Sequence, residues 1–257
     1  MSIKNILLAS LLGFAVSLGA AEKVVVAATP VPHAEILEQV KPELEKSGYT
    51  LVIKEFTDYV LPNLATDNGE VDANFFQHTP YLKEFNKSRG TKLIGVSAVH
   101  IEPMAVYSKK YKNLDDISEG ATIAVPNDPT NESRALDIIA KSGLVSFQDK
   151  ALKTPLDIIN NPKKLKFAEL KAAQLPRALN DVDIAVINSN YALAANLNPV
   201  KDSIFIEDKD SPYVNILVVK EGNEQNPKIQ ALIKALQSEK VRQFIVEKYG
   251  GAVVPAF

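Results

Sequence analysis

The sequence predicts an α/β fold built from two similar lobes. Apolar, β-branched runs of strand length alternate with amphipathic helical segments along the chain. The two halves also begin alike, with an apolar strand, a proline-rich turn, a glutamate (Glu35 or Glu132) and an amphipathic helix. In open α/β sheets, ligands bind at the carboxyl ends of the strands. Two lobes that face each other would bring those ends to one cleft, where we expect a ligand.

The composition and motif content exclude several classes of function. The 257 residues, 46% hydrophobic and 23% charged, are typical of a globular protein with a sizeable core. A net charge of −2 argues against nucleic acid or anionic membrane as a partner. The absence of cysteine excludes thiol catalysis, Cys-ligated zinc and disulfides. The sequence contains no GxSxG and no phosphate-binding glycine loop, so binding is favoured over catalysis.

Residues 1–21 are typical of a signal peptide. Lys4 precedes an apolar, uncharged run, Ile6–Leu18, and small residues follow at positions 19–21. We expect cleavage after Ala21, with an uncleaved anchor or a buried helix as the alternative. No cysteine follows the run, so a lipid anchor on an N-terminal cysteine is not expected and the exported protein should be soluble.

The first region, up to about Glu102-Pro103, alternates strand and helix four times. Pro42 lies inside the first helical pattern, where a kink is expected. The alternation predicts a parallel sheet covered on both faces. The expected strands are Lys23–Ala28, Leu51–Phe56, Val71–Phe76 and Leu93–Val99, and the expected helices are His33–Lys46, Tyr59–Asp67 and Thr79–Lys87.

The second region continues the pattern, and two amphipathic helices, Pro227–Leu236 and Glu239–Tyr249, close the chain before Gly250-Gly251. The expected strands here are Met104–Tyr107, Thr122–Val125, Lys166–Leu170, Ile184–Ile187, Ile204–Glu207 and Val214–Val219. The helical segments among them are a turn at Leu114–Ile117 and helices at Pro129–Lys141, Ala172–Leu179 and Asn190–Ala195.

The stretch Ala121–Leu136 carries the clearest sign of a ligand. After its strand, Asp128 is placed to cap a helix that has Pro129 at its first position. Arg134 follows within two turns, where the positive end of the helix dipole disfavours a cation. An anion bound between the free N–H groups and the guanidinium would make this arrangement favourable. The alternative is a surface Arg134 paired with Glu132 or Asp137.

Aromatic, amide and imidazole side chains follow the other predicted strands. The cleft candidates are His33, Asp58, Tyr59, Gln77 to Tyr81, His100 to Glu102, Asn127 to Arg134, Asn188 to Tyr191 and Asn215. Phe75 and Phe76 lie in an apolar strand, and at least one of them should be core. Asn188 and His78 could be helix caps, and the tyrosines could be packing residues. A metal site of His33, His78 and His100, joined by Glu102 or Asp58, is a further alternative. No two of these histidines share a helical face or a tight loop, so we expect no metal.

Six motifs resemble those of the methionine-binding proteins of bacterial ABC importers, the MetQ/NlpA lipoprotein family, in the family's order and over nearly the whole mature chain. The motifs are DYVLPN at 58–63, DANFFQHTPYL at 72–82, VPNDPTNESRAL at 125–136, AQLPRAL at 173–179, AVINSNYAL at 185–193 and EDKDSPYVNILVV at 207–219.

The resemblance implies a two-lobed periplasmic-binding-protein fold (type II-like) with the ligand in the interlobe cleft. One lobe is then expected over 22–102 plus 208–257 and the other over 103–207. Carried over motif by motif, the ligand-binding residues are Tyr59, Phe76, His78, Tyr81, Arg134, Asn188 and Asn215, with Glu102 a weaker candidate. Arg134 would grip the α-carboxylate, the asparagines would bind the polar end, and the aromatic residues would surround the thioether.

The implied function is capture of L-methionine and its delivery to an ABC permease and ATPase complex in the inner membrane. We expect a monomer with no catalysis, cofactor or metal. Family members are usually lipoproteins, and the missing cysteine predicts a freely diffusing periplasmic protein of a Gram-negative source. The open alternatives are a methionine-containing dipeptide or another amino acid as ligand, a His-based metal carrier, an enzyme on the same fold, and a surface adhesin.

Overall fold

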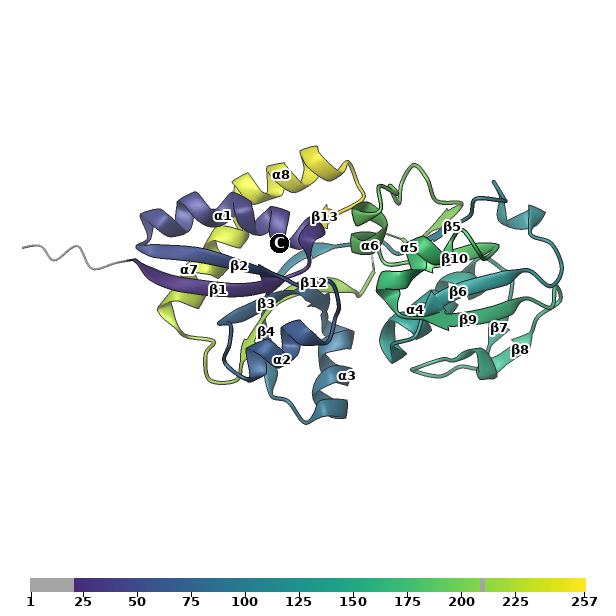
Figure 1. Cartoon of the computed structure of the whole chain (residues 1–257), viewed down its shortest axis with the longest axis horizontal. Coiled ribbons are helices and arrows are strands. Elements are labelled where there is room, and N and C mark those ends of the chain that lie inside the picture. Colours follow the sequence, from purple (N-terminus) through teal and green to yellow (C-terminus); the bar gives the residue numbers. More distant parts are fainter. Residues whose placement is uncertain (1–20, 209–210) are drawn as a thin grey trace, which may run out of the picture.

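The computed structural model describes residues 21–208 and 211–257, which form two lobes, each built on its own sheet (Figure 1). The chain passes between the lobes twice, after β4 (Leu93–Ile101) and again between β11 (Phe205–Ile206) and β12 (Val214–Lys220). An α/β fold in two lobes is therefore confirmed. The predicted signal segment lies outside the described residues, apart from Ala21. Within the described part of the chain, no helix is both long enough and apolar enough to cross a membrane.

The first lobe contains a six-stranded sheet in the order β13-β4-β12-β3-β1-β2. Its remaining strands are β1 (Glu22–Ala28), β2 (Tyr49–Glu55), β3 (Ala73–His78) and β13 (Val254–Pro255). β1 pairs in parallel with β2 and β3, but β12 lies between β3 and β4 and is antiparallel to both. β13 is also antiparallel to β4, so the prediction of a parallel sheet is wrong for three of the five strand pairings in this lobe. The apolar run of β12 is buried over most of its length, and the sheet centre is where both of its faces can be covered.

Helices cover both faces of this sheet. On one face, α1 (Glu35–Lys46), α7 (Pro227–Leu236) and α8 (Glu239–Tyr249) form the main core with alternate side chains of β1 (Figure 1). α1 follows the kinked segment η1 (Pro30–Ala34), in which Val31 has an extended backbone, and continues through Pro42. On the other face lie α2 (Leu61–Asp67) and α3 (Thr79–Arg89).

The second lobe contains a five-stranded sheet in the order β11-β5-β10-β6-β9. Its other strands are β5 (Ala105–Tyr107), β6 (Thr122–Pro126), β9 (Lys166–Leu170) and β10 (Ile184–Ile187). Its helices are α4 (Pro129–Lys141), α5 (Leu175–Ala178) and α6 (Ser189–Ala194), with 3-10 turns η2 (Leu114–Asp116), η3 (Pro155–Asp157) and η4 (Ala172–Gln174). A separate ribbon of β7 (Ser146–Phe147) and β8 (Ile158–Asn160) was not predicted, because two- and three-residue strands leave no periodic pattern.

Two boundaries differ from the sequence prediction at the cleft. β3 continues to His78, two residues beyond the expected end, and so carries Gln77 and His78 to the sheet edge. α2 begins at Leu61 rather than Tyr59, because the Asp58 carboxylate accepts hydrogen bonds from the backbone N–H groups of Val60 and Leu61. Tyr59 is thereby held in a turn beside the cleft.

Candidate ligand-binding site

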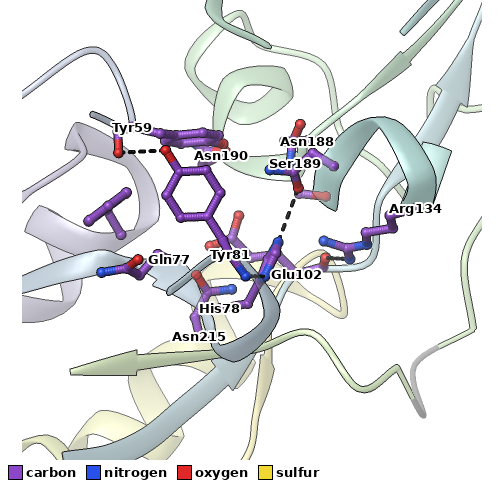
Figure 2. A pocket seen from close by; sticks show the side chains of 12 residues that line it. Tyr59, Gln77, His78, Tyr81, Glu102, Arg134, Asn188, Ser189, Asn190 and Asn215 are labelled. Atoms are coloured by element: carbon purple, nitrogen blue, oxygen red, sulfur yellow. Dashed lines mark hydrogen bonds between the residues drawn. The ribbon is translucent and has the colours of Figure 1, made fainter. Parts of the chain in front are cut away.

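A cavity lies between the lobes (Figure 2). All seven residues predicted from the motifs line it, and the structure thus brings together positions from 59 to 215 of the chain. Their contact with a ligand stays a prediction. The lining residues are Tyr59, Phe76, Gln77, His78, Tyr81, Glu102, Asn131, Arg134, Asn188, Ser189, Asn190 and Asn215.

One end of the cavity is aromatic and comes from the first lobe. The Tyr59 ring centroid lies 5.8 Å from both the Phe76 and the Tyr81 centroids. The Tyr81 hydroxyl donates to the Tyr59 carbonyl at 2.9 Å, which joins the turn before α2 to the first turn of α3. Phe76 and Tyr81 are buried. Phe75 precedes Phe76 on β3, so its side chain lies on the opposite face of the sheet, where it packs wholly into the main core. This end suits an apolar or thioether group.

Hydrogen bonds among side chains of the second lobe form an amide network that determines which asparagine atoms in the cavity wall lack a partner. Asn131 Nδ2 lies 2.9 Å from the Asp128 carboxylate, which only accepts hydrogen bonds, so Asn131 Oδ1 faces the other way. That oxygen accepts from Asn188 Nδ2 at 2.8 Å and from His78 Nε2 at 3.1 Å. Asn188 Oδ1 is consequently buried without a partner among the described residues. The cavity wall therefore holds an unsatisfied acceptor.

His78 caps α3, one of the two roles considered from the sequence. Its Nδ1 accepts from the Tyr81 backbone N–H at 3.2 Å, so the proton is on Nε2, where it is donated to Asn131. Burial, reinforced by the positive charge of Arg134, lowers the pKa of His78 to about 3. The imidazole is therefore neutral at physiological pH. Asn188 stands at the N-cap of α6, but its side chain does not cap the helix.

Arg134 is buried, with 3% of its surface exposed, and its partner differs from the sequence alternatives. Its Nε and Nη2 donate to the Glu207 carboxylate, and Nη2 also donates to the Glu102 carbonyl at 2.8 Å. The guanidinium stacks on Tyr213, 4.2 Å from the ring centroid. A surface pairing with Glu132 or Asp137 is wrong, because residues two apart on a helix do not face each other and Asp137 pairs with Lys153.

The remaining guanidinium nitrogen, Nη1, makes no hydrogen bond with any residue in 21–208 or 211–257. Glu207 and Tyr213 were missed as support for Arg134, although both lie in the 207–219 motif. A signal was available, since a buried arginine requires a buried acid, but the sequence does not say which acid.

Two of the three histidines converge, and the third does not join them. His33, His100 and Glu102 could offer ligand atoms that lie within 4.8 Å of one another, whereas His78 belongs to the amide network. The alternative of a metal site made by all three histidines is therefore wrong, because His78 does not lie with the other two. Burial raises the pKa of Glu102, and His33, then Arg134 and the Asn190 backbone N–H, act in the opposite direction. Glu102 is the single acid among the described residues that line the cavity.

Known proteins share this architecture and much of the sequence. The family model for NlpA lipoprotein matches residues 24–257. The D-methionine-binding lipoprotein MetQ of Salmonella typhi is 46% identical over 225 residues, which cover 86% of this chain and 82% of that protein.

Two solved structures are similar over nearly the whole chain. A nutrient-binding protein from Burkholderia cenocepacia, bound to methionine, has a TM-score of 0.89 at 46% identity and covers 91% of this chain and 100% of its own. A periplasmic substrate-binding protein of an ABC transporter from Coxiella burnetii has a TM-score of 0.87 at 42% identity, with 91% and 100% covered. With its sequence, fold and cavity in agreement, the chain belongs to the NlpA lipoprotein family.

Proposed function

We propose that this protein captures L-methionine in its interlobe cavity and delivers it to an ABC import permease and its ATPase. The relatives named for methionine binding, together with the neighbour bound to methionine, support this ligand. The neighbour named for an ABC transporter supports the partner and a periplasmic location. The protein acts in this role as a monomer that binds without catalysis, freely diffusing after cleavage of the signal segment.

The observation that carries the proposal is the polarity of the cavity. Its polar end presents a cation, a carboxylate and an unpartnered amide oxygen, from Arg134, Glu102 and Asn188. Its other end is the cluster of aromatic rings around Tyr59. A zwitterion with an apolar thioether side chain matches this arrangement in charge and in polarity.

Each side chain has a role that follows from its free atoms. Arg134 Nη1 binds the α-carboxylate, and so does the Asn215 amide group, because Asn215 Oδ1 already faces His33 Nε2 at 3.1 Å. Asn188 Oδ1 and the Glu102 carboxylate accept from the α-ammonium. Sulfur–aromatic contacts, worth about 0.3–1.5 kcal/mol each, favour methionine over an aliphatic side chain of similar length.

Binding and release require the lobes to move. We propose that 22–102 plus 208–257 and 103–207 move as the two units, hinged where the chain crosses between the sheets. Since the cavity has walls from both lobes, the ligand is enclosed only when they are together.

The test is calorimetric titration of protein that has been unfolded and refolded to remove carried-over ligand. We expect L-methionine to bind and leucine to bind more weakly. D-methionine and Gly-Met are included because a dipeptide or another amino acid is the alternative ligand. Binding of Gly-Met or leucine alone would mean that the cavity is specific for that ligand and not for methionine. Binding of no amino acid would contradict the proposal.

Arg134 variants test the grip on the carboxylate. Removal of Arg134 in Arg134→Ala leaves a buried carboxylate unpaired and should cost about 3–5 kcal/mol of binding free energy. The same change also leaves the buried Glu207 carboxylate without its partner. Arg134→Lys keeps the positive charge but loses the planar guanidinium, so it is the more specific variant. It should weaken binding at least about tenfold. The control is Arg242→Lys, because Arg242 stacks on Phe257 outside the cavity. Equal affinity in Arg134→Lys and Arg242→Lys would contradict the assignment.

A further inference from the structure

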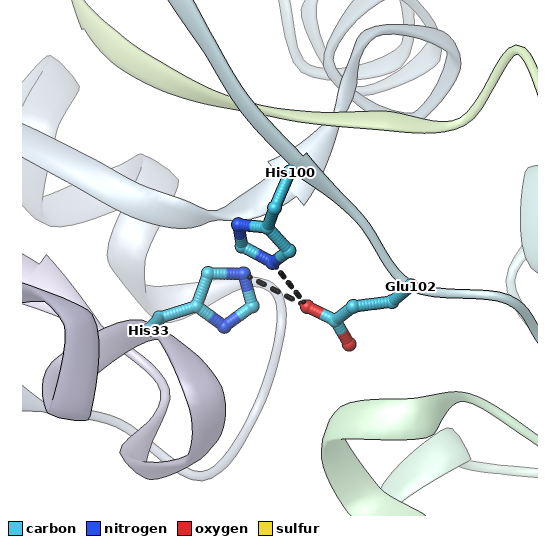
Figure 3. Close-up of side chains that lie close together, drawn as sticks. All are labelled: His33, His100 and Glu102. Carbon is cyan, nitrogen blue, oxygen red and sulfur yellow. Dashed lines mark hydrogen bonds and ion pairs between the residues drawn. The ribbon is translucent and has the colours of Figure 1, made fainter. Parts of the chain in front are cut away.

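Behind the polar end of the cavity, two histidines from the first lobe converge on Glu102 (Figure 3). His100 Nε2 lies 2.7 Å from Glu102 Oε1, and His33 Nε2 lies 3.3 Å from the same oxygen. All three side chains are buried, with exposed fractions of 1% for His33, 0% for His100 and 6% for Glu102. The ligand contacts proposed above do not use either histidine.

The hydrogen-bond partners determine where the protons are. His100 Nε2 faces a carboxylate, which only accepts, so this nitrogen carries the proton. The other nitrogen of His100, Nδ1, is buried without a partner among the described residues. A proton there would be an unsatisfied buried donor, which is costly, so His100 is neutral.

The same reasoning applies to His33. Its Nε2 faces two acceptors, Asn215 Oδ1 at 3.1 Å and Glu102 Oε1 at 3.3 Å, and a lone pair directed at the carboxylate would be repelled. The proton is therefore on Nε2, and Nδ1 accepts from the Thr29 hydroxyl at 2.7 Å. The His33 N–H therefore donates to Asn215 Oδ1 and lies beside Glu102 Oε1, which accepts the His100 N–H, and the Asn215 amide nitrogen is turned away from His33.

A metal fits this cluster less well than protons do. Bonds of about 2.0–2.1 Å in a tetrahedral zinc site place neighbouring ligand atoms roughly 3.3 Å apart, farther than the 2.7 Å between His100 Nε2 and Glu102. Coordination through Nε2 would also move the His100 proton to Nδ1, where no acceptor lies among the described residues. Hydrogen bonding accounts for the short distance without either difficulty.

We propose that His100, which donates to Glu102 Oε1, and His33, which lies beside the same oxygen, are positioning residues that orient the Glu102 carboxylate and leave its second oxygen for the α-ammonium of the ligand, whose positive charge favours the ionised carboxylate. His33 also orients the Asn215 amide toward the α-carboxylate. The pair thereby makes the site selective for ligands with a free α-amino group. This inference rests on the proposed function, because it deepens the role of the same cavity.

The test compares L-methionine with 4-(methylthio)butanoate, which lacks only the α-amino group. His100→Phe retains a ring of similar size, removes the donor to Glu102 and also removes the unpartnered Nδ1. It should weaken L-methionine binding about 10- to 100-fold and change binding of the desamino analogue by less than about threefold. His100→Gln, which can present an N–H near the Nε2 position, should restore most of the loss.

A double-mutant cycle tests whether the effect of His100→Phe on binding acts through Glu102. In a Glu102→Gln background, His100→Phe should have no further effect on L-methionine, because the charge that it positions is absent. Tyr107→Phe is the matched control, since it also removes a buried, unpartnered polar atom but lies in the core of the second lobe.

The outcomes separate this inference from the proposed function. Equal losses for both ligands would mean a merely structural role, and unchanged affinities would mean no role, so either result overturns the inference. Binding of Zn²⁺ to the wild type that His100→Phe abolishes would assign the cluster to a metal instead. Failure of the wild type to bind any amino acid would contradict the proposed function itself.

Discussion

At the scale of single residues, α4 carries two buried charged side chains with different surroundings. Arg134 has a carboxylate partner, but Glu132 Oε1 is buried without a partner among the described residues. Burial, and then the negative charges of Glu169 and Asp128, raises the pKa of Glu132 to about 7. The unfolded chain ionises this group at its ordinary value of 4.5, so its ionisation favours unfolding.

Glu132→Gln should therefore stabilise the protein at high pH. The folded state binds the extra proton between about pH 4.5 and 7, so the penalty is absent below this window and complete above it. The gain in free energy of unfolding should grow by about 2 kcal/mol between pH 5 and pH 8. Urea unfolding at both pH values measures it, with exposed Glu45→Gln on α1 as the control. A difference from wild type that does not change with pH would contradict the prediction.

At the scale of elements, the start of α4 organises the polar end of the cavity. Asp128 caps the helix by accepting from the Asn131 backbone N–H at 3.1 Å, and it also accepts from the Asn131 side chain. Asn131 in turn orients His78 and Asn188. The Asp128 cap therefore both starts α4 and determines how the Asn131 and Asn188 amides are oriented in the cavity wall.

Asp128→Ala and Ser238→Ala separate these two effects. Each removes an N-cap, since the Ser238 hydroxyl accepts from Val241 N–H at the start of α8, and each should cost about 1 kcal/mol of stability. Only Asp128→Ala should also weaken methionine binding, by about tenfold, because Asn131 loses the acceptor that orients its amide. Thermal unfolding and calorimetry measure the two quantities. A similar affinity in both variants would show that the cap does not reach the cavity.

At the scale of the whole molecule, hydrogen bonds join the lobes across the cleft. The Tyr59 hydroxyl donates to Asn190 Oδ1 at 2.5 Å, and the Tyr191 hydroxyl donates to the Thr57 carbonyl at 3.1 Å. Tyr59 and Thr57 precede α2 in the first lobe, while Asn190 and Tyr191 belong to α6 in the second. These bonds stabilise the closed arrangement, and Tyr191 contributes to it without lining the cavity.

Tyr191→Phe should weaken methionine binding about 2- to 10-fold, the worth of one neutral hydrogen bond. We expect most of the change in the dissociation rate, because the ligand leaves when the lobes separate. Stopped-flow kinetics measure that rate. The control is Tyr49→Phe, a partly buried tyrosine in the core of the first lobe. An unchanged dissociation rate in Tyr191→Phe would mean that this bond does not contribute to closure.

Much of the fold was available from local patterns in the sequence. The run at 121–136 predicted the strand, the Asp128 cap and the helix that the structure contains. The apolar periodicity of 227–249 predicted two helices with their observed bounds. The motifs identified seven residues that line one cavity, although each motif is local and the residues span most of the chain.

The sequence by itself determined the elements, their caps and the list of polar and aromatic residues that follow the strands. Only the tertiary structure decided that β12 enters between β3 and β4, that Glu207 pairs with Arg134, and that His33 reaches Asn215. It also decided that Asn188 Oδ1, rather than its nitrogen, is left unpartnered. Hydrophobic period and capping depend on residues a few positions apart, so they can be read along the chain. Pairs separated by 73 or 182 residues depend on how whole elements pack, and periodicity reports that a face is buried without specifying what covers it.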